Sequence, residues 1–302
     1  MNKKILIIGP SGIGKVYLRE SFKLGFKKIG ILGKKFDSNR NLGVSKIKKN
    51  KIYNFRTFNE CSKFNPDYTS ICTPFDLHYD HIKKARLFCK KILVEKPLIW
   101  FKQKLRNKFI DKKLKLIFKD PSSVVLVNLP FQQLAYQILK KKLIKKKVKR
   151  FIFNYHTSGK QTFSNIAVDL LPHAISFILT LNNESEINIK VFKIFHTKFT
   201  WKCKIMINNC ECHFNFKQNV SKKKNKMNFK LDKNYFIREQ KEINGDMKFW
   251  LIINKKDKLL FKNPMSHSII SSIKSFHKKK YVTKNNNLAV IIGKTTYKLI
   301  NY

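Results

Sequence analysis

Long hydrophobic runs are absent from this sequence. The amino terminus, MNKKILIIG, has only a short apolar run before a glycine, which is too short for the core of a signal peptide. No later segment approaches the ~18 uninterrupted apolar residues that a membrane span needs. We therefore expect a soluble, cytoplasmic protein with no membrane span.

Cysteine is too irregularly spaced to form a disulfide framework. The six cysteines show no paired spacing, which predicts free thiols in a reducing compartment. Residues 210–213, Cys-Glu-Cys-His, are a weak candidate for a metal site. Along a strand the two thiols would share one face while His213 would point to the other, and no second ligand pair follows. We expect no bound metal.

Acidic residues are few, because 18 Asp and Glu stand against 65 Lys and Arg and give a formal net charge of +47. The basic residues are nearly all Lys and are spread along the chain, and no recognised nucleic-acid-binding module appears. A compositional bias toward Lys and Asn explains this pattern better than a polyanion-binding role. A polyanion-binding module stays open as a less favoured alternative.

Glycine is scarce as well, and seven of the ten glycines lie before residue 44. Residues 9–17 read GPSGIGKVY, a stretch that is one residue away from two phosphate-binding patterns. The P-loop pattern GxxxxGK[ST] fails at Val16, where a hydroxyl should reach magnesium, and the dinucleotide pattern GxGxxG fails at Ser11. The glycine pattern alone leaves both interpretations open.

The order of the expected elements indicates two domains. A strand over residues 4–8, a helix over 13–24 and a strand over 29–32 form a βαβ start, which predicts parallel strands. The β-α alternation continues to about residue 100. After residue 119 strand-like runs, the first over 124–128, follow one another with hairpin-type breaks and favour an α+β domain with a mostly antiparallel sheet.

The segment from residue 70 to residue 98 reads SICTPFDLHYDHIKKARLFCKKILVEKPL. Its Thr-Pro pair, a histidine four residues later, a helix and a strand closing with Glu-Lys-Pro resemble the signature of the glucose-fructose oxidoreductase, inositol dehydrogenase and MocA-like (Gfo/Idh/MocA) family. The resemblance implies an α/β fold: a Rossmann domain with a doubly wound parallel sheet over residues 1–118, then an α+β substrate-binding and oligomerisation domain over 119–302.

The resemblance implies that the glycine loop binds a dinucleotide. Gly9 would make the tight turn, Ser11 would replace the glycine beside the pyrophosphate, and Gly14 would allow close packing of helix on strand. Where NAD enzymes hold the ribose with an acidic side chain, this chain has Lys34 and Lys35, which suit a 2'-phosphate. We expect NADP or NAD as cofactor, with NADP favoured, although Asp37 is close enough to hold a ribose. The expected cofactor-binding residues are Gly9, Ser11, Gly12, Ile13, Gly14, Lys34, Lys35, Cys72, Thr73, Pro74, His78, Glu95 and Lys96.

The chemistry that the resemblance implies is hydride transfer between the nicotinamide and a hydroxyl- or ketone-bearing carbon of a sugar, nucleotide sugar or polyol. Lys96 matches the family lysine beside the nicotinamide. Residues 164–181, SNIAVDLLPHAISFILTL, resemble the pattern D-x-G-x-H-x-x-D, in which Asp169 and His173 match. We expect Lys96 and His173 to be the catalytic, proton-handling pair. The expected substrate-binding residues are Lys96, Asn128, His156, Asp169, His173 and Ser176.

Three departures from the family pattern keep alternatives open. Leu171 replaces the middle glycine, Ser176 replaces the final aspartate, and Ser11 replaces a loop glycine. A degenerate member that binds nucleotide without turnover is therefore the second interpretation, and a P-loop kinase is the third. The resemblance also implies a homo-oligomer, a dimer or tetramer, acting on a small carbohydrate-type substrate without specific nucleic-acid binding.

Overall fold

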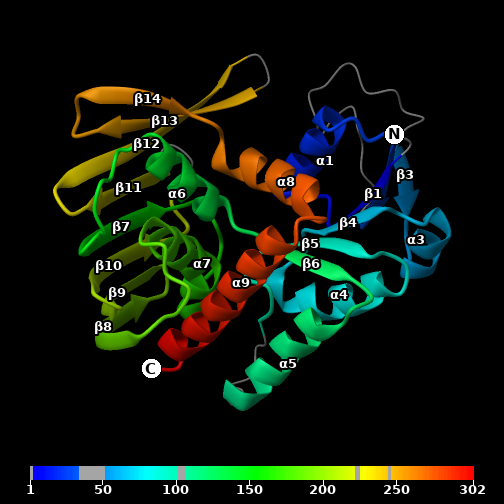
Figure 1. Ribbon diagram of the computed structural model, residues 1–302, viewed down its shortest axis with the longest axis horizontal. Coiled ribbons are helices and arrows are strands. Elements are labelled where there is room, and N and C mark those ends of the chain that lie inside the picture. Colours follow the sequence, from blue (N-terminus) through cyan, green and yellow to red (C-terminus); the bar gives the residue numbers. More distant parts are fainter. Residues whose placement is uncertain (1–2, 34–51, 101–106, 222–224, 244–245) are drawn as a thin grey trace. The chain divides into compact units, whose positions relative to one another are not determined.

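The chain divides into two compact units. The computed structural model describes residues 3–33, 52–100, 107–221, 225–243 and 246–302. The first unit comprises Met1–Asn128 and Ser266–Val290, and the second comprises Leu129–Met265 and Ile291–Tyr302. Each unit is built around one large β-sheet (Figure 1).

The first unit contains a six-stranded sheet in which all neighbouring strands run parallel. Its spatial order is β3-β2-β1-β4-β5-β6, so consecutive pairing breaks between β1 and β4. This is the strand order of the doubly wound dinucleotide-binding fold, in which ligands bind beyond the carboxyl ends of the strands at that break. The prediction of a Rossmann-type parallel sheet is confirmed. The strands are β1 (Lys4–Ile8), β2 (Lys28–Leu32), β3 (Ile52–Phe55), β4 (Tyr68–Ile71), β5 (Lys91–Glu95) and β6 (Val124–Asn128).

Helices lie between these strands in the chain. The first helix starts at Gly14, one residue later than expected, and its Tyr17 and Leu18 are buried against the sheet. The helix after β3 is capped by Thr57, whose side chain accepts a hydrogen bond from the Glu60 N–H. The helices between the strands are α1 (Gly14–Lys23), α3 (Phe58–Phe64), the short 3-10 helix η2 (Phe75–Leu77), α4 (His78–Arg86) and α5 (Asn107–Lys119). Near the carboxy terminus lie α8 (Pro264–Ser275) and α9 (Lys279–Ile300), of which residues 266–290 belong to this unit.

Strand β6 places the boundary between the units later than we expected from the sequence. It pairs in parallel with β5, from Lys91 opposite Val124 to Glu95 opposite Asn128. The expected boundary after residue 118 would have put this strand in the second domain, whereas the amino-terminal segment of the first unit runs to Asn128. A five-residue apolar run, VVLVN, does not reveal which sheet it joins or in which direction it runs.

One side chain completes the hydrogen bonding of β6 at the edge of the sheet. Asn285 on α9 is 2% exposed. Its Oδ1 accepts a hydrogen bond from the Val127 N–H at 2.8 Å, and its Nδ2 donates to the Val127 carbonyl oxygen at 2.9 Å. A buried backbone N–H or C=O that lacks a partner is costly, so the amide replaces a neighbouring strand at this residue.

Substituting Asn285 by leucine should lower the free energy of unfolding by about 2 to 4 kcal/mol, because two buried backbone groups lose their partners. Chemical denaturation of the purified protein measures the change. The matched control is Asn287→Leu on the exposed side of the same helix, which should change stability by less than about 0.5 kcal/mol. Equal effects of the two variants would contradict this role for Asn285.

The second unit is built on an eight-stranded sheet of order β14-β13-β12-β11-β7-β10-β9-β8. Strands β7 and β10 run parallel, and the other neighbouring strands that the structure describes run antiparallel. The prediction of a large, mostly antiparallel sheet is confirmed. The strands are β7 (Arg150–His156), β8 (Ile189–Thr197), β9 (Thr200–Ile207), β10 (Cys210–Lys217), β11 (Lys226–Leu231), β12 (Asn234–Ile243), β13 (Asp246–Ile253) and β14 (Asp257–Phe261).

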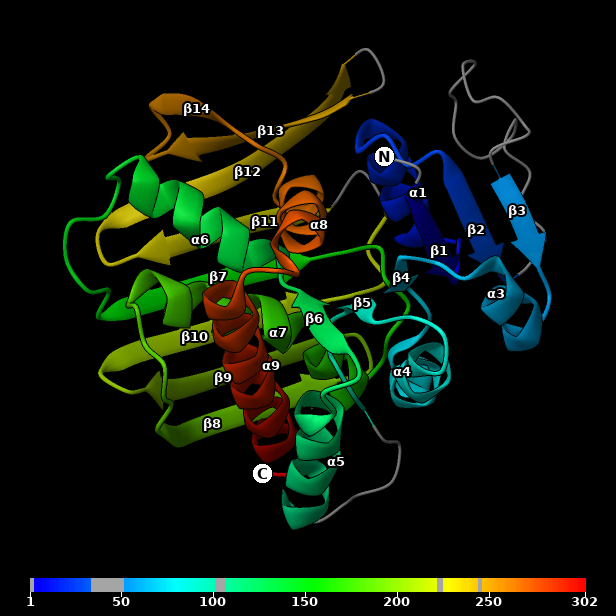
Figure 2. The ribbon, with the colours of Figure 1, turned by 45° about the vertical axis from the view of Figure 1, so that its right-hand side comes forward.

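Two helices cover one face of this sheet, α6 (Pro130–Lys140) and α7 (Ser164–Leu181). Helix α7 lies against β7, β9 and β10 and packs on α6 (Figure 2). An aromatic cluster fills the space between helix and sheet, including Phe151, Phe153, Phe177 and Phe229, all fully buried. Helix α7 is long and apolar enough to cross a membrane by composition, but 83% of it is buried within the protein, which is typical of a core helix.

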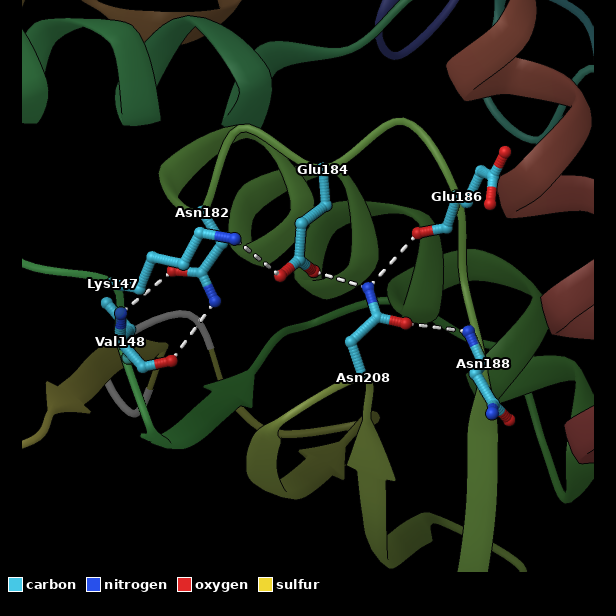
Figure 3. A network of polar contacts seen from close by, with 7 residues as sticks. All are labelled: Lys147, Val148, Asn182, Glu184, Glu186, Asn188 and Asn208. Carbon is cyan, nitrogen blue, oxygen red and sulfur yellow. Dashed lines mark hydrogen bonds and ion pairs between the residues drawn. The ribbon is translucent and has the colours of Figure 1, made fainter.

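The carboxyl end of α7 is held by a polar network (Figure 3). Asn182 caps the helix, accepts from the Val148 N–H at 2.8 Å and donates to the Val148 carbonyl oxygen at 3.0 Å. Asn208 donates to the Glu184 carboxylate at 2.5 Å and accepts from the Asn188 N–H at 2.7 Å. These bonds fix α7 to the strands around it, so the helix presents its amino-terminal half in a defined position.

Candidate functional site

The loop after β1 is shaped so that only glycine fits at two of its positions. Gly9 has φ +83°, and a Cβ there would lie 2.9 Å from the Thr73 backbone nitrogen. A Cβ at Gly14 would lie 2.1 Å from the Gly9 carbonyl oxygen. Gly9 thus makes the turn, and Gly14 lets α1 start directly against it, as a dinucleotide loop requires.

The start of α1 is the natural place for the phosphates of a cofactor. The first N–H groups of a helix lack partners within the helix, and the dipole favours an anion there. Ser11 and Gly12 are exposed at the tip of the loop, and Gly12, with φ +53°, has open space where a Cβ would stand. The residues present therefore fit a dinucleotide. Lys34, Lys35 and Asp37, which we expected at the ribose, lie outside the described residues.

Glu95, the last residue of β5, is the centre of a buried hydrogen-bond network. Its Oε1 accepts from the Tyr17 hydroxyl at 2.7 Å and from the Asn128 Nδ2 at 2.6 Å. Burial raises the pKa of Glu95, and the Asn128 hydrogen bond and the Lys96 charge oppose that rise. Burial, followed by the charge of Glu95, raises the pKa of Tyr17. The network ties the first turn of α1 to the ends of β5 and β6.

Two predicted site residues therefore act in support. Glu95, expected to contact cofactor, is 5% exposed, and Asn128, expected to contact substrate, is fully buried and donates to Glu95. Both hold the backbone that carries Lys96. Lys96 itself is partly exposed, directly follows β5, and is joined to Pro97 by a cis peptide bond.

His78 links the two motifs that carried the family resemblance. Its Nδ1 lies 2.7 Å from the Pro97 carbonyl oxygen and its Nε2 lies 2.9 Å from the Thr73 carbonyl oxygen. The side chain is 1% exposed and lies between the two turns, so it links them from beneath. Its contact with the cofactor, which we expected from the sequence, stays a prediction. Pro74 is exposed and Thr73 partly exposed beside it, while Cys72 is buried under the loop.

His78 should make the stability of the protein depend on pH. Burial lowers its pKa from 6.5 to about 4, although the two carbonyl contacts act to raise it. Between pH 6.5 and 4 the unfolded chain takes up a proton that the folded chain does not, so stability falls as pH falls through this window. The loss should be about 3 kcal/mol.

Urea denaturation at pH 7 and at pH 4.5 measures this effect. In the variant His78→Gln the side chain cannot titrate, so it should show a smaller loss of stability between the two pH values than the native chain. His277→Gln, at an exposed position, is the control and should keep the native dependence. Parallel losses in the native chain and His78→Gln would show that His78 is not responsible.

The second unit presents Asp169 and His173 on one face of α7, since they are four residues apart. The His173 ring is 6% exposed and lies 4.6 Å from the ring of Phe131 and 5.8 Å from that of Tyr155. Asp169 is partly exposed, and its Oδ2 accepts from the Gln218 Nε2 at 2.8 Å. A carboxylate and an imidazole are thus held side by side on a rigid helix.

The other two predicted substrate residues of this unit face elsewhere. Ser176 is fully buried, and its hydroxyl donates a hydrogen bond to the His173 carbonyl oxygen at 3.0 Å, a backbone acceptor within the same helix. His156 follows Tyr155 on β7, and because side chains alternate along a strand it points to the face away from α7. Neither residue shares a surface with His173.

Sequence reasoning missed Tyr17, which contacts Glu95 in the first unit, and Gln218 and Arg238, which contact Asp169 and Tyr155 in the second. Gln218 is 1% exposed and accepts from the Gln161 N–H at 2.8 Å while it holds Asp169. A Cβ at Gly159 would lie 2.3 Å from the Gln218 Oε1. Glycine is rare beyond residue 44, so Gly159 is the sequence feature that could have indicated a close approach of the Gln218 side chain to the backbone.

The cysteine cluster on β10 lies apart from these residues. Cys210 and Cys212 are buried on the core face, and His213 on the other face lies 2.6 Å from the Glu211 carboxylate. The hydrogen bonds from His213 and Lys204 lower the pKa of Glu211 to about 2. Within the part of the chain that the structure describes, no three metal-binding side chains gather in one place.

Comparison with solved structures shows the same fold in dehydrogenases and a ketoreductase. A UDP-N-acetylglucosamine 3-dehydrogenase from Acidithiobacillus ferrooxidans has TM-score 0.65 and 11% identity over 99% of this chain and 96% of its own. A 3-ketoreductase from Actinomadura kijaniata in complex with NADP and TDP-benzene has TM-score 0.65 and 11% identity over 97% and 96%. The WlbA dehydrogenase from Thermus thermophilus, in complex with NAD and UDP-GlcNAcA, has TM-score 0.62 and 15% identity over 99% and 94%.

Comparison at the sequence level gives the family. No curated protein sequence matches the chain significantly. The model of the oxidoreductase family with an NAD-binding Rossmann fold, Gfo/Idh/MocA, matches residues 3–107, which include the glycine loop and both motifs that His78 joins. Residues 3–107 therefore match the Gfo/Idh/MocA oxidoreductase family, as the resemblance predicted.

Proposed function

We propose that this chain is an NAD(P)-dependent oxidoreductase that acts on a hydroxyl or ketone carbon of a sugar, with nucleotide-linked sugars the favoured class. The observation that carries this proposal is the glycine cradle of Gly9 and Gly14 at the carboxyl end of β1, in a sheet of dinucleotide-binding order. The family match over the same residues supports it. The solved structures with this fold include enzymes whose ligands are NADP or NAD and nucleotide sugars.

The proton of the substrate hydroxyl is handled by Lys96 and His173 in this proposal. NAD(P) supplies or accepts the hydride at C4 of its nicotinamide. Lys96 is partly exposed at the end of β5, and the Tyr17–Glu95–Asn128 network fixes the backbone on which it stands. His173 offers an imidazole, a group suited to proton exchange near neutral pH. Asp169, held by Gln218, binds substrate hydroxyls beside it.

The cofactor choice rests on the basic residues after β2. We propose that Lys34 and Lys35 bind the 2'-phosphate of NADP, because ammonium groups neutralise phosphate and cannot accept hydrogen bonds from a ribose. The end of β2 does reach the glycine loop, since a Cβ at Gly33 would lie 2.8 Å from the Pro10 ring. Gly33, the residue directly before these lysines, therefore lies against the glycine loop.

We also propose that the protein is a cytoplasmic homo-oligomer that associates through the face of the large sheet that α6 and α7 do not cover. A row of three asparagines crosses this face: Asn154 bonds to Asn228 at 2.8 Å and to Asn215 at 3.2 Å. Phe195 on β8 is 49% exposed nearby. All six cysteines are free and buried, which suits a reducing compartment.

A second candidate, a family member that binds nucleotide without turnover, is favoured by Ser176. At the position of the family aspartate it is buried, bonded within the helix, and unable to ionise at neutral pH. Absorbance at 340 nm with a sugar panel separates this candidate from an active enzyme.

Equilibrium binding to the intact protein tests the cofactor assignment. NADPH or NADH should bind, with an enhancement of nicotinamide fluorescence that ADP-ribose competes away. ATP with magnesium should not compete at the same concentration, because Val16 offers no hydroxyl to the metal. Binding of ATP with magnesium in the absence of any NAD(P)H binding would favour the P-loop kinase and exclude the proposed function.

A further inference from the structure

Arg238 brings a positive charge to the same surface as His173. Its guanidinium carbon lies 5.4 Å from the centre of the Tyr155 ring. That ring in turn lies 5.8 Å from the His173 ring. All three residues belong to the second unit, so Tyr155 connects the cation to the candidate acid-base residue through two ring contacts.

The register of the sheet explains why Arg238 points toward α7. Phe236, two residues earlier on β12, is fully buried and stacks on Phe229 at 4.7 Å. Side chains two apart on a strand share a face, so Arg238 lies on the core face of the sheet. Tyr155 pairs with Met227 on β11, the strand between β7 and β12, and the arginine reaches across that strand to the ring.

No carboxylate among the described residues forms an ion pair with Arg238. Its neighbour Glu239 pairs with Lys258 at 2.6 Å on the other face. The side chain is partly buried rather than extended into solvent. A partly desolvated cation gains most from an anion that arrives with a ligand.

The choice of arginine at this position is itself informative. Of the 65 basic residues only seven are arginine, so lysine is the default cation of this chain. Arg86 shows where arginine is used: its Nε donates to the Ser123 hydroxyl at 2.8 Å, and its two terminal nitrogens donate to the Leu116 and Ile117 carbonyl oxygens. The planar guanidinium group of arginine can stack on an aromatic ring and bind two oxygens at once, which the ammonium group of lysine cannot do.

We propose that Arg238 binds an oxyanion of the substrate, a phosphate or a carboxylate, and thereby restricts the enzyme to charged carbohydrates. The inference rests on the proposed function, because it takes the surface around His173 as the substrate surface. The Tyr155 ring holds the guanidinium by a cation-π contact, leaving its edge for the oxyanion. Arg238 is thus a specificity-determining residue, and Lys96 and His173 remain the groups that handle the proton.

Calorimetric titration of the intact protein tests this inference, with UDP-N-acetylglucosamine and UDP as phosphate ligands, glucuronate as a carboxylate ligand and N-acetylglucosamine as a neutral one. Arg238→Met should weaken binding of the preferred anionic ligand by about 30-fold, and Arg238→Lys by about tenfold, because the fork is lost in both. Arg150→Met, an exposed arginine at the opposite end of β7, is the matched control and should change binding less than twofold. Weak binding of the neutral sugar should be the same in all four proteins.

The titrations are run with and without saturating NADPH, so the answer does not depend on the cofactor. Failure of NADPH to bind the native chain counts against the proposed function and leaves the Arg238 comparison intact. Native-like binding of every anion by Arg238→Met, or binding of no anion by the native chain, overturns the inference. Arg238→Lys keeps the positive charge. If this variant has a lower melting temperature but the same preference for anions as the native chain, Arg238 has only a structural role, and the inference is overturned.

Discussion

Replacing Lys96 by methionine should lower kcat by about a thousandfold, because the group that exchanges a proton with the substrate oxygen is lost. Methionine keeps most of the apolar stem, and the Tyr17 and Asn128 bonds to Glu95 hold the backbone in place. The Kd for NADPH should therefore change little. Steady-state rates at 340 nm and fluorescence titration of NADPH measure the two quantities.

The control for this variant is Lys91→Met at the opposite end of β5. Lys91 lies over the Tyr68 ring at 5.0 Å, far along the strand from Glu95, so its loss should leave kcat unchanged. If Lys96→Met kept more than a tenth of the native kcat, another group would have to carry the proton, and the role given to Lys96 would be excluded.

Substituting Gly14 by alanine should abolish cofactor binding, with the Kd for NADPH rising by more than about 100-fold. The added methyl group would lie 2.1 Å from the Gly9 carbonyl oxygen, and a backbone atom cannot move aside without reshaping the whole loop. The first turn of α1 would then shift away from the phosphates. Fluorescence titration with NADPH measures the loss.

Gly12→Ala is the matched control in the same loop. A Cβ there meets no protein atom within 4 Å, so within the protein the change costs the strain of alanine at φ +53°, about 1 kcal/mol. NADPH should still bind to this variant. If Gly14→Ala bound NADPH as well as Gly12→Ala does, the dinucleotide would not lie on this loop.

Local patterns predicted the parts of the fold in which neighbouring residues decide the structure. The continuous apolar runs of β1 and β5 are typical of buried parallel strands. The bounds of β1 were predicted to the residue, and a strand closing at the Glu-Lys-Pro motif was expected where β5 lies. Strand β6 looks the same in sequence, but its sheet is decided by long-range pairing with β5. The contact of Asn285 with Val127 spans 158 residues, so no local pattern could have shown that the carboxy-terminal segment completes the first unit.

In the candidate site, too, residues in local motifs could be predicted from the sequence, whereas residues with long-range contacts could not. Gly9, Gly14, Lys96, Asp169 and His173 stand in short motifs and could be named from the sequence. Their supports could not, because Tyr17 is 78 residues from Glu95 and Gln218 is 49 residues from Asp169. The sequence did not distinguish Arg238 from the other basic residues of the chain, which has 65 in total. Only the register of the sheet places it beside Tyr155.

Hydride transfer to the nicotinamide is the most direct measurement of the central proposal. The native protein, saturated with NADP or NAD, is mixed rapidly with UDP-N-acetylglucosamine and other nucleotide sugars while absorbance at 340 nm is followed. The account predicts a rise in absorbance with at least one of these sugars, and none with Lys96→Met. No change with either cofactor and any sugar, in a protein shown to bind NAD(P)H, would contradict it and leave a nucleotide-binding protein without turnover.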